Sequence, residues 1–577
     1  MNQRSTLGGL CLALLLAVGV SCTDEKSGST GPVTMVKDAQ LPDRSMTDEV
    51  VVEFFADYEK FYANREFDSG GTLVVGRTAD SDALNPIVTS LQSGREVCAM
   101  LFLKLTRLNP DFSAGPEIAK SWKFSEDRKE LTFYLRDDIY WHDGVQTTAH
   151  DVKFTHERAK DPKVAWSAIK WKEHIEDVVV IDDTTVKFVF SKVYPYQLMD
   201  AGVGQIIPKH LLEDIPPEGL KNAEFNRNPV GNGPFKFRDW EDQQFVDIVA
   251  NEKFYLGRPP LDRIIYKVVP DHDSLRLQLI NGEVDFVQRM PPKFYKDLVT
   301  QPHLRPQVFP ERGYTYLGWN TKNPLFASKK VRQAMTMAID REEIIKALLF
   351  EFGQVARSPV SPITWGYNPD VPDFPFDLEK SKKLLAEEGW ADTDGDGWID
   401  KNGQKFSFTL KTNKGNQIRE DLTVIIQDML KQVGVEVTPQ LKEARAFFDD
   451  MEKKQFDAGI AGWIVGLKMD LTTLWHTKSI DDKFNFCSYS NAEVDRLTDT
   501  AKFEMDSTKS GEMWKRAQSI IADDQPYTFL FIQRNINWVH RRFQNVQMKT
   551  VAWYYNLDGW WVPKDQRKFK TFEPSTD

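Results

Sequence analysis

The chain has 577 residues, of which 41% are hydrophobic and 28% are charged, a composition typical of a globular protein. Because a single hydrophobic core stops growing at roughly 250–300 residues, we expect several domain-sized units. The formal net charge is −11, from 74 basic and 85 acidic side chains. A mildly acidic chain without a long basic run excludes nucleic acid as a partner and excludes membrane binding through a polybasic patch.

The N-terminus has the pattern of an export signal. Arg4 gives a short positive region, and residues 7–20 are apolar. This apolar stretch is shorter than the about 20 residues that span a bilayer, so it predicts a cleaved signal and not a transmembrane helix. No later apolar run reaches spanning length. We therefore expect the mature protein to lie outside the inner membrane.

Cys22 follows this signal, and the small residues Gly19 and Ser21 stand just before it. The segment resembles the bacterial lipoprotein signal, in which cleavage leaves the Cys as the lipidated first residue. Gly19 departs from that pattern, which prefers Leu three residues before the Cys. We expect residues 1–22 to be a lipoprotein signal peptide with Cys22 as the lipid anchor. A plain secretory signal cleaved near Ser21 is the alternative.

The mature chain is predicted to begin with a tether and one helix over residues 23–70. Beyond this segment, strand and helix patterns alternate to the end of the chain. The predicted strands are 72–77, 131–136, 178–180, 186–190, 264–269, 435–440 and 456–463, and the predicted helices are 148–159, 273–280, 341–350, 378–388 and 419–433. Thr148, Asp340 and Asp377 each stand where a capping residue opens a helix. This mixed order predicts an α/β protein with mixed sheets.

Seven groups of residues stand out in order along the chain: Pro116–Trp122, Trp141–Gly144, Asn228–Phe237, Gly282–Asp285, Lys330–Ala334, Leu384–Trp390 and Asn491–Leu497. In sequence and spacing they resemble the large peptide/nickel class of periplasmic solute-binding proteins (extracellular solute-binding protein family 5). One such match would be weak evidence. The ordered set spans roughly residues 70–560 and is specific.

The resemblance implies the two-lobed periplasmic binding protein fold of the class with an extra domain, with a hinge between the lobes. The implied parts are a discontinuous first lobe at 70–108, 228–310 and 528–577, an extra domain of that lobe at 109–227, and a second lobe at 311–527. Cys98 and Cys487 would then fall on different lobes. Because a disulfide between the lobes would oppose closure, we expect two free, buried thiols.

The function implied by the resemblance is that of the substrate-binding component of an ABC importer. Such a protein captures a peptide-like solute between its lobes and delivers it unchanged to a membrane permease. The implied partners are the solute and the permease and ATPase subunits. We expect a monomer on the periplasmic or cell-surface side, held at the membrane by its lipid alone. We expect no catalytic residue and no cofactor, apart from the calcium ion considered below.

Three alternatives stay open. The same fold could bind an oligosaccharide, a nickel chelate or haem. A hydrolytic enzyme is the alternative of another class, although no Ser–His–Asp order, metal cluster or phosphate loop stands out in the sequence. A sensor or chaperone that borrows the fold is the third.

The ligand-binding segment implied by the resemblance starts at Trp463 and includes Val465 and Gly466. In the family, the strand end after this Trp pairs with the ligand backbone, and an Asp three places after the Trp holds the α-amine of a peptide. Gly466 stands at that place here, and the nearest carboxylate is Asp470. Either Asp470 takes over the role or the ligand lacks a free amine there; Asp470 as a helix cap is the structural alternative.

Other candidate positions are weaker. Trp365 is a further candidate for lining the cleft, and Trp319 is another. Ser93 and Gly94 lie where the family's first lobe offers backbone groups to the ligand.

Two motifs could suggest other chemistry. His142 and Asp143 are adjacent in a Trp-His-Asp-Gly turn, which predicts a turn and not a catalytic pair. The segment Gly231–Gly233 is followed by Pro234 and a strand, so it offers no helix N-terminus to a phosphate. We expect this segment to be a chain crossing between lobes.

An acidic segment imitates a calcium loop. Asp392, Asp394, Asp396 and Asp400 stand at the first, third, fifth and ninth places, with Gly at the sixth. The bidentate Glu expected at place twelve is absent, because Gly403 stands there. Calcium bound by these four residues is one hypothesis, and a tight acidic hairpin turn is the other.

Overall fold

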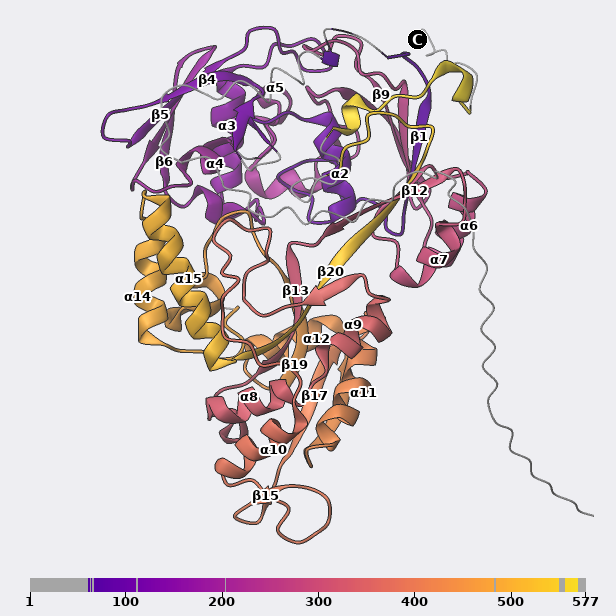
Figure 1. Ribbon diagram of the computed structural model, residues 1–577. Coiled ribbons are helices and arrows are strands. Elements are labelled where there is room, and N and C mark those ends of the chain that lie inside the picture. The colour runs from indigo at the N-terminus through magenta and orange to yellow at the C-terminus, as the bar shows by residue number, and fades with distance from the viewer. Residues whose placement is uncertain are drawn as a thin grey trace, which may run out of the picture. The chain divides into compact units, whose positions relative to one another are not determined.

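The structure, a computed structural model, describes residues 61–62, 64, 67–109, 113–202, 204–481, 484–548 and 556–568 (Figure 1). The predicted signal peptide with Cys22, and most of the predicted tether and helix at 23–70, lie outside these residues. Within the described ranges, no helix combines the length and the apolar character that crossing a bilayer demands.

A mixed sheet of twelve strands runs through the described part of the chain. Its continuous order is β18 (Glu436–Lys442), β17 (Ser407–Asn413), β19 (Ala458–Ile464), β13 (Gly313–Trp319), β20 (Tyr527–His540), β11 (Phe286–Val287), β1 (Thr72–Arg77), β10 (Arg263–Val268), β9 (Phe245–Ala250) and β8 (Phe235–Glu241). Two further strands, β12 (Leu304–Pro310) and β14 (Gly353–Val355), pair with β20 outside this order. Parallel pairs join β1 to β10 and β17 to β18, while β20 is antiparallel to its neighbours.

Strand β20 is shared by two lobes. Its residues 527–533 pair with β13 and β14, and its residues 534–540 pair with β12 and β11. We call the part built on β1 and β8–β12 the first lobe and the part built on β13–β19 the second lobe. Figure 1 shows β20 as the yellow strand that runs from one lobe into the other. The first-lobe segment expected to begin at 528 therefore includes residues that pair with the second lobe.

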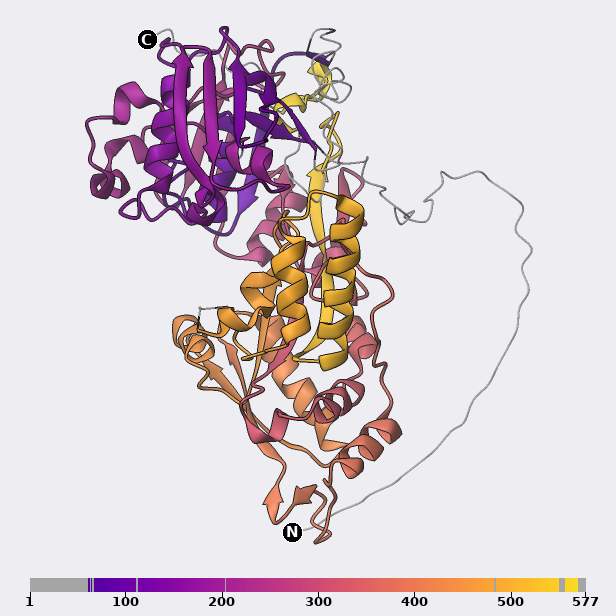
Figure 2. The ribbon, with the colours of Figure 1, turned by 90° about the vertical axis from the view of Figure 1, so that its left-hand side faces the viewer.

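The extra domain is built on a four-stranded antiparallel sheet. Its order is β4 (Ala119–Phe124), β5 (Glu130–Leu135), β7 (Thr185–Phe190) and β6 (Ile175–Asp182). Figure 2 shows these purple strands side by side. Smaller elements of this region are β2 (Thr106–Leu108), β3 (Ala114–Pro116), α3 (Ala149–Lys160), η1 (Ile169–Lys172), α4 (Gln197–Gly202), α5 (Lys209–Leu212), η2 (Pro217–Asn222) and η3 (Glu224–Asn226).

Helices flank the large sheet in both lobes. The first lobe contains α2 (Gln92–Leu101), α6 (His272–Ile280), η4 (Pro292–Phe294) and α7 (Tyr295–Leu298). The second lobe contains η5 (Pro324–Phe326), α8 (Lys329–Met337), α9 (Arg341–Leu349), α10 (Leu378–Glu387), the hairpin β15 (Asp400–Lys401) and β16 (Gln404–Lys405), α11 (Gln417–Lys431), α12 (Ala444–Glu452), α13 (Thr472–Trp475), η6 (Thr477–Ile480), α14 (Ala492–Ala501) and α15 (Ser507–Asp524). The turns η7 (Leu557–Gly559) and η8 (Lys564–Gln566) follow β20.

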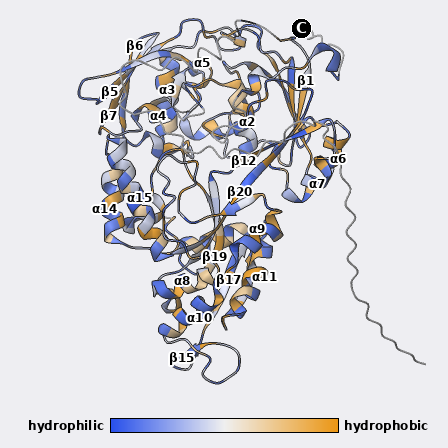
Figure 3. Cartoon of the chain, in the orientation of Figure 1, coloured by the Kyte–Doolittle hydropathy of each residue, from blue (hydrophilic) through white to orange (hydrophobic). Residues whose placement is uncertain are grey.

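The expected helix starts are confirmed by their hydrogen bonds. The Asp340 carboxylate accepts from the N–H of Glu343, and the Asp377 carboxylate accepts from the N–H of Lys380, each at 3.0 Å. The Asp151 carboxylate accepts from the N–H of Thr148 at 2.9 Å, as a capping box requires. Hydrophilic and hydrophobic residues alternate along α8, α10 and α11 (Figure 3). In α10 and α11 the buried residues recur at helical spacing, with Ser381 and Leu385 in the first and Leu422, Ile426 and Leu430 in the second.

The cysteines Cys98 and Cys487 are free and buried, as expected. Cys98 lies in α2 of the first lobe, and Cys487 precedes α14 in the second lobe. Burial raises the pKa of both thiols above the ordinary value. Both side chains therefore act as small apolar groups in the core.

A buried ion pair joins three strands of the first lobe. The carboxylate of Asp285, fully buried before β11, accepts from Nη2 of Arg542 at 2.6 Å and from the N–H of Val74 in β1 at 3.0 Å. Its backbone oxygen accepts from the N–H of His540 at the end of β20. Burial raises the pKa of Asp285, and the Arg542 guanidinium opposes this shift. Asp285 therefore ties β1, β11 and β20 together.

We expect Arg542→Met to lower the free energy of unfolding by about 3–5 kcal/mol, because it leaves the Asp285 carboxylate buried without its cation. Urea denaturation followed by Trp fluorescence measures this change. The matched control is Arg276→Met, which removes the more exposed pair with Asp297 in the same lobe and is expected to cost about 0–1 kcal/mol. Equal effects of the two substitutions would contradict the role of Asp285.

Candidate functional site

Trp463 lies near the end of β19 in a stack of aromatic rings. Its ring packs on Phe486 with centroids 5.3 Å apart and an angle of 23°. On the neighbouring strand it lies parallel to Tyr316, at 9° and 6.3 Å. Its Nε1–H donates to the Tyr527 hydroxyl at 3.3 Å. The ring is half-buried, so part of this rigid aromatic surface is accessible.

The backbone that follows β19 has polar groups without hydrogen-bond partners among the described residues. The N–H of Val465 donates to the carbonyl of Arg312 at 3.4 Å, and this bond ends the pairing of the strand. Within the described residues, Gly466 and Leu467 make no hydrogen bond through their backbones. Gly466 is exposed, and a Cβ atom added there would have its nearest neighbour at 4.0 Å. These free backbone groups suit a ligand that pairs as a short extra strand.

Asp470 accepts hydrogen bonds just before the short helix α13, whose N-cap residue is Leu471. Its Oδ1 accepts from the N–H of Thr472 at 2.8 Å and from the hydroxyl of the same residue at 2.6 Å. These bonds stabilise the first turn of α13. Asp470 is thus bonded to Thr472 but does not occupy the N-cap position that the structural alternative expected, and its role toward a ligand amine stays a prediction.

Trp365 and the segment after Gly466 contact the extra domain. The Tyr196 hydroxyl accepts from the N–H of Met469 at 2.8 Å and from Nε1–H of Trp365 at 3.4 Å. Lys468 forms an ion pair with Asp200 and lies 5.0 Å above the ring of Trp171. The second lobe and the extra domain are thus joined by hydrogen bonds and a charge pair.

Asp200 is buried at this junction. Burial raises the pKa of Asp200, while the Lys468 ammonium and the Tyr194 hydroxyl lower it. That hydroxyl donates to Oδ2 at 2.8 Å. Lys172 donates to the Asp200 carbonyl at 2.7 Å, and burial lowers the pKa of Lys172 to about 8. Removal of Lys468 would leave a buried carboxylate without a cation at 4 Å or less among the described residues.

A second contact across this junction involves Phe503, after α14. Its ring lies 5.9 Å from that of His174, and the Lys192 ammonium lies 5.0 Å above it. Figure 1 shows α14 and α15 beside the extra domain. The junction therefore extends over two separate segments of the second lobe.

Ser93 and Gly94 lie in the first turn of α2. The Ser93 hydroxyl donates to the Asp80 carbonyl at 2.7 Å, and the Ser93 carbonyl accepts from Arg77 at 3.0 Å. A Cβ atom on Gly94 would lie 2.6 Å from the Ala83 carbonyl, so Gly is required there. Both residues have structural contacts, and their contact with a ligand stays a prediction.

The structure brings together only some of the residues that the sequence predicts to bind the ligand. Trp463, Val465 and Gly466 lie along one strand end, and Trp365 meets the segment that follows it through Tyr196. The residues missed from the sequence are Tyr196, Asp200 and Lys468, which make the cross-junction contacts. No local pattern marks them, because each partner is more than 200 residues away in sequence.

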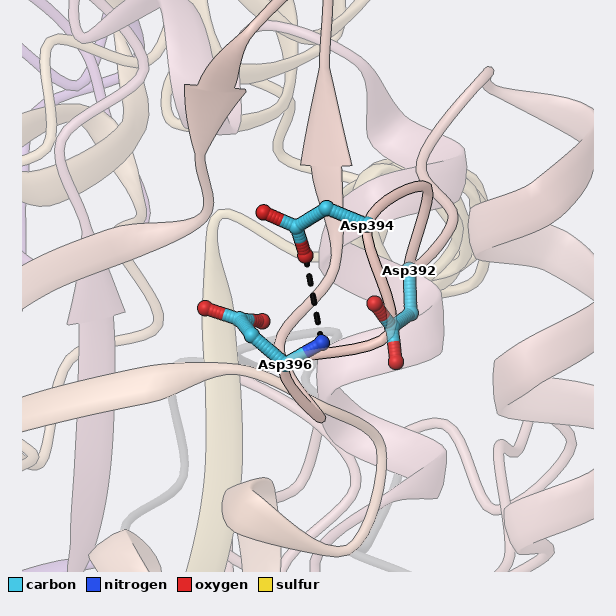
Figure 4. A group of neighbouring side chains, drawn as sticks. All are labelled: Asp392, Asp394 and Asp396. Atoms are coloured by element: carbon cyan, nitrogen blue, oxygen red, sulfur yellow. Dashed lines mark hydrogen bonds between the residues drawn. The ribbon is translucent and has the colours of Figure 1, made fainter.

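The acidic loop gathers three of its four aspartates. One carboxylate oxygen from each of Asp392, Asp394 and Asp396 lies within 4.8 Å of the others, and all three residues are exposed (Figure 4). All three also accept from loop backbone N–H groups, as in the 3.1 Å bond that joins the N–H of Asp396 to Oδ1 of Asp394. The Asp400 carboxylate instead accepts from the hydroxyl and N–H of Thr393. Calcium at this loop stays a prediction.

The histidine of the Trp-His-Asp-Gly motif has a structural role. Nδ1 of His142 accepts from the N–H of Gly231, and Nε2–H donates to the Gly233 carbonyl, both at 3.1 Å. Burial lowers the pKa of His142 to about 4. Asp143 pairs instead with Nε2 of His210 at 2.8 Å. Both ring nitrogens of His142 are thus occupied by backbone groups.

The Gly-rich segment that His142 contacts is packed against the end of α2. A Cβ atom on Gly231 would lie 1.9 Å from the Leu101 carbonyl, so no other residue fits. The N–H groups of Asn232 and Gly233 both donate to that carbonyl. The segment links the extra domain to β8 of the first lobe, so it crosses between these two parts and not across the hinge.

A cavity lies where the extra domain packs against the first lobe, and its lining includes Ile87, Val152, His156, Trp166 and Phe188. His156 is buried, and neither ring nitrogen has a hydrogen-bond partner among the described residues. Burial lowers the pKa of His156 to about 3, and the nearby Lys172 and Lys160 add to this shift. His156 is therefore neutral at physiological pH.

The chain is similar to proteins of a known family. Residues 114–485 match the family described as bacterial extracellular solute-binding proteins, family 5 middle. The oligopeptide-binding protein AppA of Bacillus subtilis is 36% identical over 506 residues, which cover 86% of this chain and 92% of AppA. Heme-binding protein A of Haemophilus influenzae is 29% identical over 438 residues, which cover 71% of this chain and 78% of that protein.

Solved structures show the same fold. AppA from Bacillus subtilis in complex with a nonapeptide superposes with a TM-score of 0.74 at 35% identity, covering 86% of this chain and 100% of that chain. NikZ from Campylobacter jejuni in complex with Ni(L-His) gives a TM-score of 0.72 at 27% identity, covering 85% of this chain and 99% of that chain. Both structures match the chain across both lobes and the extra domain.

We expect Lys468→Met to weaken the contact between the second lobe and the extra domain, because it leaves Asp200 buried without its cation, at a cost of about 3–5 kcal/mol. Small-angle scattering of the ligand-free protein should then give a larger radius of gyration. The control is Lys509→Met, a 68% exposed lysine of the same lobe. An unchanged radius with only a lower melting temperature would contradict a role in holding the junction.

We expect the protein to lose stability as the pH falls below about 6.5, the usual pKa of a histidine in an unfolded chain. The folded-state pKa of His156 is lowered to about 3, so the unfolded state binds more protons between these values. This one group should destabilise the fold by about 2 kcal/mol at pH 5 relative to pH 8. Urea denaturation at several pH values measures the slope.

His156→Gln removes this titration and should flatten the slope between pH 6.5 and pH 4 by roughly 1.4 kcal/mol per pH unit. His150→Gln, which removes an exposed histidine from the same helix, is the control for the loss of a histidine. A slope that His156→Gln does not alter would refute the assignment.

Proposed function

Because the chain belongs to the bacterial extracellular solute-binding proteins of family 5, we propose that it is the substrate-binding component of an ABC importer for peptide-like solutes. The observation that carries this proposal is the match to a peptide-binding relative over 86% of the chain. The protein would capture the solute between its lobes and release it unchanged to a membrane permease with its ATPase.

Closure would use the shared strand as a hinge. Two chain segments cross between the lobes near this point: β20, and the link from β12 to β13 at residues 311–312. A solute that contacts both lobes supplies the differential affinity that favours the closed state. The open backbone at Gly466 and the aromatic surface of Trp463 would form the second lobe's share of this contact.

Main-chain recognition supports a broad choice of peptides. Backbone hydrogen bonds at the end of β19 would fix the peptide without reading its side chains. Gly466 offers no carboxylate to a peptide amine, in contrast to the Asp that family peptide binders place there. A peptide anchored elsewhere, or one whose amine lies beyond this point, fits the observed residue.

We propose binding without catalysis. The His142 ring is held by two backbone groups, and its neighbour Asp143 pairs with His210. With both ring nitrogens bonded to backbone groups, His142 is not available as a general base. Hydrolysis is the alternative, and mass spectrometry of a peptide incubated with purified protein tests it.

The location follows from the family and the N-terminal pattern. An extracytoplasmic protein needs an export signal, which residues 1–22 supply. We propose that Cys22 carries the lipid, that a single copy of the chain acts with the permease and ATPase, and that no other membrane contact is required.

We expect a thermal-shift screen to find peptides as stabilising solutes. A peptide present at 100 times its dissociation constant should stabilise the folded state by about 2.7 kcal/mol. Chelated nickel, haem and oligosaccharides form the comparison arms, because relatives bind some of these. Stabilisation by one of these arms and by no peptide would overturn the peptide assignment.

Trp463→Phe should weaken the binding of the best peptide by about tenfold or more, because central aromatic residues dominate such sites. Phe keeps the ring stack and loses area and the bond to Tyr527. Isothermal titration calorimetry measures the affinity, and circular dichroism checks the fold. Trp398→Phe, in the acidic loop, is the control. Equal affinities of the two variants would remove Trp463 from the site.

A further inference from the structure

Tyr196 stands where the extra domain meets the second lobe. It directly precedes α4, and its side chain is buried, with 8% of the residue exposed. Its hydroxyl oxygen accepts from the backbone N–H of Met469 at 2.8 Å and from Nε1–H of Trp365 at 3.4 Å. Met469 follows β19, whereas Trp365 lies in the segment between β14 and α10. One oxygen of the extra domain therefore binds two segments of the second lobe that are distant in sequence.

The extra domain holds the backbone around Tyr196 in place. The Tyr196 carbonyl accepts from the N–H of Asp200 at 2.9 Å, in the first turn of α4. The next residue, Gln197, is 1% exposed. Its side chain accepts from the N–H of Tyr194 at 3.2 Å and donates to the Arg128 carbonyl at 2.8 Å. Because these bonds lie inside the extra domain, this domain sets the position of the Tyr196 hydroxyl.

The main chain between β19 and α13 depends on this contact. Strand pairing ends at Val465, and within the described residues Gly466 makes no backbone hydrogen bond. Further along, the N–H of Met469 donates to Tyr196. Met469 is itself 1% exposed, and an added Cβ atom on Gly366 would lie 3.0 Å from its Cγ. The bond to Tyr196 therefore fixes the main chain three residues beyond Gly466, where a solute is expected to pair.

The neighbouring ion pair acts differently. Lys468 and Asp200 join through the ends of their side chains. A lysine side chain is flexible and carries a compact charge, so this pair favours the approach of the two parts without fixing the backbone. The ring of Tyr196 is rigid, and its hydroxyl bonds a backbone group directly. The ion pair thus brings the parts together, while Tyr196 determines the conformation of the segment after β19.

We propose that Tyr196 is a positioning residue for solute binding, which holds the main chain after β19 in the conformation that pairs with the solute. The extra domain would then take part in binding without any contact between Tyr196 and the solute. This inference rests on the proposed binding of peptide-like solutes as a short added strand. It adds that the extra domain, and not only the two lobes, sets the affinity.

The contact joins parts that move against each other. The extra domain is tied to the first lobe through His142 and the segment at 231–233, whereas Met469 belongs to the second lobe. The bond between Tyr196 and Met469 is therefore made when the lobes are closed and lost when they open. A contact that is made only in the closed state favours that state. Its loss should speed the release of a bound solute more than it slows capture.

Stopped-flow measurements of intrinsic Trp fluorescence with an alanine–valine nonapeptide test this inference. We expect Tyr196→Phe to weaken binding by about 10- to 100-fold, because the buried N–H of Met469 loses its acceptor. Most of this change should appear as faster dissociation, with a smaller change in the association rate. Trp365→Phe removes only one of the two bonds to the hydroxyl and leaves that of Met469, so it should have a smaller effect.

Hydrogen exchange of the peptide complex separates positioning from a structural role. In Tyr196→Phe the amides of residues 466–469 should exchange about tenfold faster than in the wild type, while those of α4 stay unchanged. Tyr140→Phe is the matched control, since it removes the hydroxyl of a 49% exposed tyrosine in the same domain. A lower melting temperature of free Tyr196→Phe, with dissociation and exchange as in the wild type, would show a structural role and overturn the inference.

Two further outcomes separate this inference from the proposed function. Binding of the nonapeptide by the wild type, with the same dissociation rate in Tyr196→Phe, overturns the positioning role and leaves the peptide-binding function standing. Failure of the wild type to bind the nonapeptide overturns the peptide function, and the inference with it.

Discussion

The hydrogen bonding of one strand to both lobes is the constraint on which the rest of the structure depends. Strand β20 uses its first half to pair with β13 and β14 and its second half to pair with β12 and β11. Backbone polar groups in a sheet must stay paired, so the lobes can move against each other only where these partners change. The end of β19 lies in the strand order next to β13, one strand away from this crossing. The hinge and the candidate site are therefore built from neighbouring strands.

The charged side chains near the shared strand β20 differ in how fully they are paired. At the junction with the extra domain, Asp200 and Lys468 compensate each other, and Tyr194 and Lys172 satisfy the remaining groups of Asp200. At the end of β19, the Arg419 guanidinium has the Asn413 amide as its side-chain hydrogen-bond partner among the described residues. A satisfied buried pair favours one arrangement of the two protein parts that it joins. The pair of Asp200 and Lys468 therefore suits the joining of the second lobe to the extra domain.

Several of the motif residues that carry the family resemblance hold the fold together. His142 and the Gly231–Gly233 segment lock the extra domain to the end of α2, and Asp285 joins β1, β11 and β20. Such residues are confined by close packing, because a single added atom would collide with a backbone carbonyl. The open strand end imposes no such limit. Gly466 has room for a side chain, since an added Cβ atom would have its nearest neighbour at 4.0 Å.

The sequence by itself determined the local structure and the family. Helix caps such as Asp340 and Asp377 act over three residues, and the strand at 72–77 has its bounds where the pattern predicted them. The ordered motifs also pointed to the two-lobed fold and to the strand end at Trp463. Only the tertiary structure decided that Asp470 is bonded to Thr472, that Asp400 lies apart from the other three aspartates, and that Tyr196 meets Met469 across 273 residues. The physical reason is the distance along the sequence over which each feature acts. A cap or a strand pattern depends on neighbours in the chain, whereas the partner of a buried charge depends on how distant segments pack.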